Sequence, residues 1–233
     1  MPWYRHGHCV GVSMSTIVFQ ENVRIPFSVV DLDSFREWAK SDEFPDRGRY
    51  SFLNGELWVD LMPERLFTHN RVKVEFAYVL HGILKADRSA QFFGDGTLVT
   101  NVEAGLSTEP DGTVVLFDSL KRDRVRLIEA AGEGYIEIAG TPDLVLEIVS
   151  ATSVQKDTVV LRDLYWQANI PEYWLVDVRS DRLDFDILKH GRHGYVATRK
   201  QAGWVRSGVL GRAFRLSCRP DSLGNPEYTL AMR

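Results

Sequence analysis

Residues 142–149 read PDLVLEIV, and this stretch decides the fold. Five of the six residues after the Pro-Asp pair are apolar, which is typical of a strand buried on both faces of a sheet. The segment 156–168 has apolar residues at helical spacing, and residues 173–178 form a second apolar run. A strand, a helix and a strand in this order predict a βαβ unit with two parallel strands.

Helices and strands are also mixed in the rest of the chain. Residues 31–40 predict a short amphipathic helix with an acidic first turn, and residues 65–87 predict a long one. The Asn54-Gly55 pair predicts a β-hairpin over residues 49–62. Further strands are predicted at residues 91–93, 97–100, 113–117, 125–128 and 135–138, and a β-meander over 183–216. We therefore expect one α/β (or α+β) domain with a mixed sheet.

The composition is that of a globular protein. Of the 233 residues, 44% are hydrophobic and 26% are charged, and no apolar run approaches the ~18 residues of a membrane span. The two cysteines, Cys9 and Cys218, are too few for a disulfide framework, so a cytoplasmic setting is expected. Residues 1–14 show no periodicity and are expected to be a flexible tail, which leaves residues 15–233 as a single domain.

Charge is distributed unevenly along the chain. Residues 1–178 carry 17 Lys and Arg against 27 Asp and Glu, whereas residues 179–233 carry 11 against 5. An anionic partner would therefore meet the basic, β-rich part at 179–233 most readily, although a solvated basic surface explains the same pattern. Glycine-rich phosphate loops and the G-x-S-x-G elbow are absent from the sequence, which removes the main support for nucleotide-binding folds and serine hydrolases.

One acidic residue interrupts the central apolar strand. Strand geometry places Glu147 on the face of Val145 and Val149, opposite Leu144, Leu146 and Ile148. Burying a carboxylate there costs several kcal/mol unless a cation or hydrogen-bond donors compensate. A buried ion pair, an exposed strand edge and a divalent metal ion would each explain this residue.

A similar Pro-Asp pattern precedes two strands. Asp143 precedes the strand at 144–149, where a turn-capping, structural role is favoured. Asp111 precedes the strand at 113–117, and it can reach the side of Glu147 if the two strands pair. Two carboxylates about 4 Å apart repel by about 4 kcal/mol at an effective dielectric constant of ~20. A bound Mg²⁺ (or Mn²⁺) would reverse the sign of that interaction.

Three stretches carry a family resemblance: EPDGTVVLF at 109–117, PDLVLEIVS at 142–150 and KDTVVLRDLYWQANIPEYWLVD at 156–177. They resemble the Uma family (Uma-two) of restriction endonucleases, which belongs to the PD-(D/E)XK nuclease superfamily. The resemblance covers about residues 31–190. It implies a restriction-endonuclease-like mixed sheet flanked by helices, followed here by the C-terminal β-meander. It also implies an Mg²⁺- or Mn²⁺-dependent endonuclease that hydrolyses DNA.

The resemblance assigns roles to individual residues. It makes Asp111 a metal-binding residue and Glu147 the acid of the D/E-x-K element. NGELW at 54–58 matches a further family piece, in which Glu56 is either a third metal ligand or an ordinary hairpin residue. His69, in another matching helix, either faces the site or is a helix-end histidine.

The lysine of the family pattern is missing. Val149 occupies its in-strand position, and Leu161 occupies the position on the next helix where Uma sequences usually carry a lysine. Lys156, about one helical turn earlier, is the best substitute. Arg162 is the second choice, because one residue rotates a side chain by about 100° around a helix.

Three functions remain open at this stage. The first is a metal-dependent DNA endonuclease, expected as a homodimer with no membrane association. The second is a nucleic-acid- or protein-binding module on the same fold, and the third is a structural homodimer assembled through the β-meander. Metal binding separates the first from the others, and salt-dependent DNA binding separates the second from the third.

Overall fold

The computed structural model describes residues 16–18, 23–130, 134–180 and 183–233. The tail predicted at residues 1–14 lies outside the described residues. No helix in the described part of the chain is both long and apolar enough to cross a membrane.

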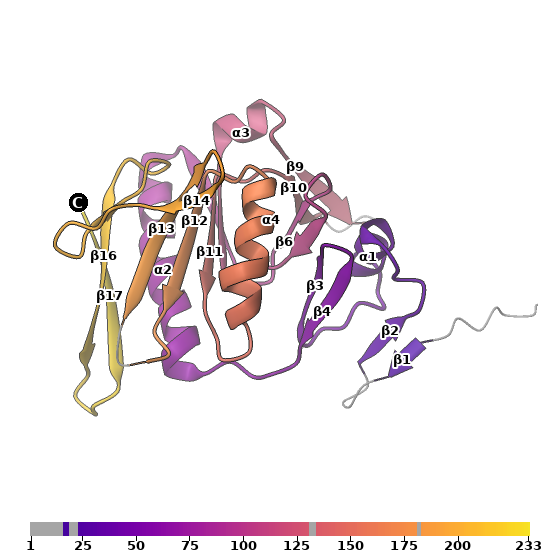
Figure 1. Ribbon diagram of the computed structural model, residues 1–233, viewed down its shortest axis with the longest axis horizontal. Helices are drawn as coiled ribbons and strands as arrows, with labels where there is room; N and C mark the ends of the chain where they lie inside the picture. Colours follow the sequence, from indigo (N-terminus) through magenta and orange to yellow (C-terminus); the bar gives the residue numbers. More distant parts are fainter. Residues whose placement is uncertain (1–15, 19–22, 131–133, 181–182) are drawn as a thin grey trace, which may run out of the picture.

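A six-stranded mixed sheet forms the centre of the molecule (Figure 1). Its strands, in spatial order, are β14 (Gly194–Ala197), β13 (Asp184–Gly191), β12 (Glu172–Asp177), β11 (Leu144–Ile148), β8 (Gly112–Leu116) and β5 (Ala90–Gly94). Strands β11 and β12 are parallel neighbours, and the other pairs are antiparallel. The π-helical turn η3 (Lys156–Val160) and helix α4 (Leu161–Gln167) connect β11 to β12, which confirms the predicted βαβ unit.

Helices cover both faces of this sheet (Figure 1). The π-helical turn η2 (Leu66–Asn70) continues directly into α2 (Arg71–Asp87) behind the sheet, and α4 lies in front of it. The apolar residues of β11 divide as the period of two predicts. Leu144, Leu146 and Ile148 join the core on the α2 side, whereas Val145 packs with α4. Glu147 therefore points toward the α4 side.

A second six-stranded mixed sheet lies beside the first. In spatial order it contains β4 (Glu56–Asp60), β3 (Arg49–Leu53), β7 (Leu106–Thr108), β6 (Leu98–Asn101), β10 (Gly134–Gly140) and β9 (Val125–Ala130). The hairpin of β3 and β4 turns at Asn54 and Gly55, whose φ angles are 50° and 84°, as the Asn-Gly pair predicts. Helix α1 (Leu32–Ala39) packs Phe35 and Trp38 against this sheet. Two short strands, β1 (Thr16–Val18) and β2 (Arg24–Pro26), pair nearby.

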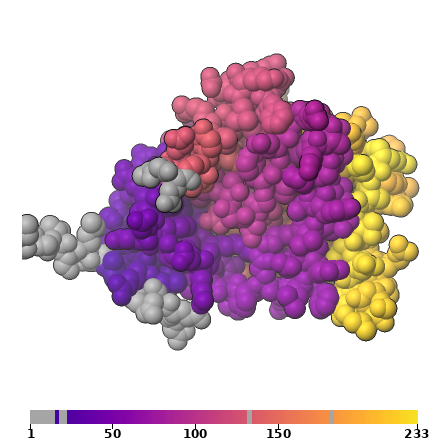
Figure 2. Space-filling model, turned by 180° about the vertical axis from the view of Figure 1, so that it is seen from behind, coloured from indigo at the N-terminus to yellow at the C-terminus, as the bar shows by residue number. Residues whose placement is uncertain are grey.

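The predicted C-terminal meander is divided between two sheets. Strands β13 and β14 extend the central sheet, while β15 (Val205–Arg206), β16 (Ala213–Pro220) and β17 (Pro226–Met232) form a separate antiparallel one. The reason is that both parts bury apolar side chains in the same core, Phe185 and Ile187 from β13 and Phe214 from β16. Figure 2 shows the C-terminal strands beside the segment around α2 on the back of the molecule.

The short helix α3 (Phe117–Lys121) was not expected from the sequence, and Asp143 holds its start. The carboxylate of Asp143 accepts hydrogen bonds from the backbone N–H of Leu116 and the hydroxyl of Ser119, both at 2.8 Å. Asp143 is buried, and Arg124 lies 3.4 Å away. This arrangement is the turn-capping role predicted for Asp143.

Replacement of Asp143 by Ala should lower the free energy of unfolding by about 2–4 kcal/mol, because two buried donors lose a charged acceptor. Urea denaturation measures this loss. Asp118→Ala is the matched control, since Asp118 is exposed on the same helix, and it should change stability by less than about 0.5 kcal/mol. Equal stability of the two variants would contradict the structural role of Asp143.

Candidate active site

Asp111 and Glu147 face each other across two strands of the central sheet. The antiparallel register pairs Leu146 with Gly112, so the next step along each strand brings Glu147 opposite Asp111. The backbone N–H of Ile148 donates a hydrogen bond of 2.7 Å to Asp111 Oδ2. Both side chains are buried, with relative exposures of 7% for Asp111 and 3% for Glu147. The pairing predicted from the sequence therefore brings the two acids together.

Glu147 is held in a buried environment. The hydroxyl of Tyr165, on α4, donates a hydrogen bond of 2.6 Å to Glu147 Oε1. Burial raises the pKa of Glu147 well above its ordinary value, and the charges of Asp157 and Asp111 act in the same direction. Lys156 opposes this rise most strongly among the neighbouring groups. Lys156 is therefore the neighbouring group that does most to favour the carboxylate form of Glu147.

Lys156, at the start of η3, interacts electrostatically with this carboxyl group. Burial disfavours its charged form, but the negative charges of Glu147, Asp157 and Asp111 outweigh that effect and raise the pKa of Lys156. Its Nζ lies 3.7 Å from Asp157 Oδ1. The structure thus brings the lysine predicted as the substitute cation to the acid pair, in its protonated form.

Asp157 is a third acid at this side of the site. Its Oδ2 accepts a short hydrogen bond from the hydroxyl of Ser153, whereas its buried Oδ1 has no hydrogen-bond partner among the described residues. Burial raises the pKa of Asp157 to about 6, against the attraction of Lys156. The sequence does not single out Asp157, because Lys-Asp pairs are common at helix starts.

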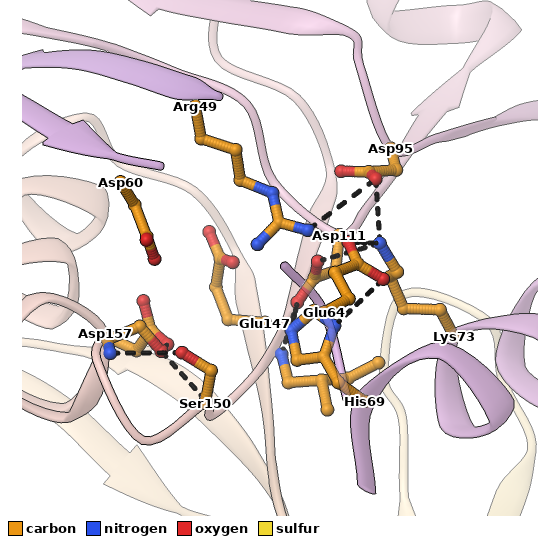
Figure 3. Close-up of polar contacts among 12 residues, drawn as sticks. Arg49, Asp60, Glu64, His69, Lys73, Asp95, Asp111, Glu147, Ser150 and Asp157 are labelled. Atoms are coloured by element: carbon orange, nitrogen blue, oxygen red, sulfur yellow. Dashed lines mark hydrogen bonds and ion pairs between the residues drawn. The ribbon is translucent and has the colours of Figure 1, made fainter. Parts of the chain in front are cut away.

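Asp111 contacts a second group of charges on its other side (Figure 3). His69 Nε2 lies 3.4 Å from Asp111 Oδ2, and Lys73 Nζ lies 3.8 Å from Oδ1. Burial would raise the pKa of Asp111, but the hydrogen bond and charge of His69, with Lys73 and the Ile148 N–H, hold it below its ordinary value. Asp111 is therefore a carboxylate, and His69 faces the site.

Two further acids in this group, Glu64 and Asp95, form ion pairs with two cations (Figure 3). Lys73 Nζ lies 2.7 Å from Asp95 Oδ2 and forms a close ion pair with Glu64. Arg49, at the start of β3, also forms a close ion pair with Glu64 and lies 3.8 Å from Asp95. Sequence reasoning missed these four residues. Only Lys73 had a local signal, since it follows His69 by four residues on one helical face.

Two sequence candidates lie outside this cluster. Glu56 is exposed beside the hairpin turn, and four residue steps along the strand, roughly 13 Å, separate it from Asp60. Asp60, at the other end of β4, is the residue of that strand that reaches the site (Figure 3). Arg162 is exposed on α4, where its Nη2 donates to the backbone oxygen of Tyr195 at 3.2 Å. Arg162 therefore contacts β14, which β13 and β12 separate from β11, so the structure brings neither candidate to the acid pair.

Two cavities open beside the acid pair. The first has a volume of about 250 Å³ and is lined in part by His69, which contacts Asp111. The second, of about 390 Å³, is lined in part by Lys156. Arg49 and Asp60 border both cavities, so the two adjoin. A substrate in this region would meet His69 and Lys156 before the two buried acids.

The donor set fits a hard divalent cation held by few protein ligands. Among the described residues, no group of three or more His, Cys, Asp and Glu side chains is arranged to hold a metal ion. Asp111 and Glu147 nevertheless offer carboxylate oxygens from adjacent strands. Mg²⁺ commonly takes one or two carboxylates and completes its shell with water and phosphate oxygens. The two acids match that requirement.

In metal-free protein, Glu147→Gln should stabilise the chain increasingly as pH rises. Folding raises the pKa of Glu147, so the wild type loses stability as pH rises above about 4.3, the value of an unfolded Glu. Gln stays neutral and can still accept from Tyr165. Between about pH 5 and 8 the stability difference should grow as pH rises. Urea denaturation at both pH values measures this difference between the wild type and the variant. An equal stability difference at both pH values would contradict a raised pKa of Glu147.

Comparison with known proteins places these residues in a family context. Residues 32–217 match the model of the Uma2 family, whose description is "Putative restriction endonuclease". The crystal structure of "a putative nuclease belonging to DUF820" from Anabaena variabilis ATCC 29413 has the same fold, with a TM-score of 0.57 and 18% sequence identity. The match covers 78% of this chain and 91% of that chain. No curated protein matches the chain.

Proposed function

Because the chain belongs to the Uma2 family of restriction-endonuclease-like proteins, we propose that it is a metal-dependent endonuclease that hydrolyses DNA phosphodiester bonds. One observation carries this proposal. The buried acids Asp111 and Glu147 lie opposite each other, and Lys156, which lines an adjoining cavity, interacts electrostatically with both, although the sequence lacks the lysine in both positions where the family pattern expects it. Acids and a cation together are what phosphodiester hydrolysis requires.

Asp111 and Glu147 would hold the metal ion. A bound Mg²⁺ or Mn²⁺ supplies polarisation of the phosphodiester and lowers the pKa of a nearby water. The ammonium of Lys156 stabilises the negative charge that develops on the phosphate oxygens, since its neighbouring acids keep it protonated. It is not a ligand of the metal.

Other residues hold the two acids in place. Tyr165 fixes one oxygen of Glu147 through its hydroxyl group. The Ile148 N–H and His69 fix Asp111 from two directions. These contacts would position the carboxylate oxygens of Asp111 and Glu147 for binding the metal ion.

The proposal also covers the substrate, the oligomeric state, the cellular location and the domain organisation. The substrate is DNA, the working state is a homodimer in the cytoplasm, and residues 15–233 form one domain. The basic part at 179–233 supports an anionic substrate, because it carries 11 Lys and Arg against 5 Asp and Glu. Light scattering of the purified protein tests the dimer, and limited proteolysis tests the single domain.

The residues at the two positions where the family pattern expects a lysine favour a second function. Val149 and Leu161 are both fully buried apolar residues, so neither supplies a charge to the site. If Lys156 does not replace that charge, the fold would act as a nucleic-acid-binding module without cleavage. Such a module would bind DNA with an affinity that falls steeply with salt.

Conversion of supercoiled plasmid DNA tests the proposal. The purified chain should nick or linearise the plasmid with Mg²⁺ or Mn²⁺ and leave it intact with EDTA. Asp111→Asn, prepared in the same way, excludes a contaminating nuclease. No metal-dependent conversion, or equal conversion by this variant, would refute the proposed activity. DNA binding by an inactive wild type would favour the binding module.

A further inference from the structure

A cavity of about 250 Å³ lies next to the acid pair and has no role in the chemistry described above. Its wall includes the chain before and at the start of the long helix, the end of β4, and the turn that follows β11. His69 belongs both to this wall and to the contacts of Asp111. Whatever occupies the cavity therefore lies beside the candidate catalytic acids.

The helix that borders this cavity begins without a cap. It runs from Leu66 through η2 and α2 to Asp87, and Arg65 precedes it with no side-chain hydrogen bond to the first turn. The first-turn N–H groups, from Leu66 to Thr68, have no acceptor within the helix. Arg65 and Thr68 line the cavity. The positive end of a helix 22 residues long, counted over both segments, thus faces this space.

A buried histidine gives the second, independent observation. His69 is only 3% exposed and lines the cavity. Its Nδ1 has no hydrogen-bond partner among the described residues, and it lies 3.4 Å from Glu64 Oε2, which is longer than a good hydrogen bond. A buried polar atom without a partner is unusual and calls for a ligand or water.

The charges around the cavity favour an anion. The side chain of Arg65 makes no hydrogen bond or ion pair with any residue that the structure describes, and Arg179 is held by Asp177 through two side-chain hydrogen bonds of 3.0 and 2.8 Å. Two acids also line the cavity. Glu64 is neutralised by Arg49 and Lys73, and Asp60 accepts a hydrogen bond of 2.8 Å from Thr152. The Arg65 guanidinium and the helix end remain available to an anion, whereas Arg179 is already paired with Asp177.

We propose that this cavity binds a DNA phosphate next to the one that is cleaved. The proposal rests on the proposed endonuclease function and names a substrate subsite for it. The volume is below the ~300 Å³ of a typical small-molecule pocket, so the cavity suits one phosphate and part of its sugar. Arg65 would contact the phosphate through its guanidinium group, with the helix N–H groups as further donors.

Salt-dependent DNA binding tests this subsite. Binding of a labelled short duplex is measured in EDTA, where no cleavage occurs, between about 50 and 200 mM salt. Loss of one phosphate contact in Arg65→Ala should reduce the slope of log affinity against log salt by about 0.9. Arg65→Lys should keep most of the slope. Arg126→Ala is the control, because Arg126 is exposed on β9, at the opposite edge of the second sheet from β4.

Arg179→Ala provides a second variant at the same cavity, and it should reduce the slope less than Arg65→Ala, because Asp177 already pairs Arg179. If the wild type cleaves DNA and neither variant changes the slope, the subsite is wrong and the endonuclease function stands. If the wild type neither cleaves nor binds DNA, the proposed function is wrong, and the subsite that rests on it is wrong as well. A reduced slope in Arg126→Ala equal to that in Arg65→Ala would also overturn the subsite.

Discussion

Replacement of Asp111 by Asn should reduce DNA cleavage by at least about 10²-fold. A metal ion contributes several kcal/mol of charge stabilisation, and each 1.4 kcal/mol corresponds to about tenfold in rate. Asn keeps the shape of Asp111 and can still accept from the Ile148 N–H, so the fold should persist. The initial rate of plasmid nicking in Mn²⁺ measures the effect.

Glu56→Gln is the control for this experiment, since Glu56 is exposed at the hairpin turn. It should cleave at the wild-type rate. Circular dichroism of both variants establishes that they are folded. A folded Asp111→Asn protein with wild-type activity would mean that the cleavage site lies elsewhere.

Replacement of Lys156 by Ala should lower the cleavage rate by about 30- to 1,000-fold. Loss of one preorganised donor to a developing charge costs about 2–4 kcal/mol of transition-state stabilisation. Metal affinity should be preserved, because Lys156 is not a ligand. The catalytic rate at saturating Mn²⁺, measured together with the Mn²⁺ dependence, separates the two effects.

Arg162→Ala is the matched comparison for Lys156. Arg162 is exposed and hydrogen-bonded to β14, away from Glu147, so its loss should leave the rate within about twofold of wild type. A strong loss in Arg162→Ala with normal cleavage by Lys156→Ala would reverse the assignment of the cation.

Much of the fold could be predicted because local rules govern it. The period of two assigned each face of β11 correctly, since Leu144 and Leu146 face one helix layer and Val145 the other. The Asn54-Gly55 turn followed from the positive φ angles that it requires. The division of the C-terminal strands between two sheets could not be predicted, because sheet membership depends on contacts distant in sequence.

Part of the site could be predicted from the register of one strand pair, and Lys156 and His69 from the family pattern. Asp111 and Glu147 followed from the register of β8 and β11. Arg49 and Asp95 come from other strands or loops, and no spacing in the sequence links them to Asp111. Glu56 was a candidate because its strand matches a family piece, and nothing in the sequence pointed to Asp60, since the position of the strand end in the fold decides which acid reaches the site.

Calorimetric titration with Mn²⁺ tests the central claim most directly, because it follows the metal at the two acids without DNA. The wild type should bind one ion, with Glu147→Gln at least about tenfold weaker, in line with the loss of one charged ligand. Thermal unfolding of the same samples should show a smaller metal-induced stabilisation in the variant. Equal Mn²⁺ affinity of the wild type and Glu147→Gln would contradict the account, because the ion would then bind elsewhere.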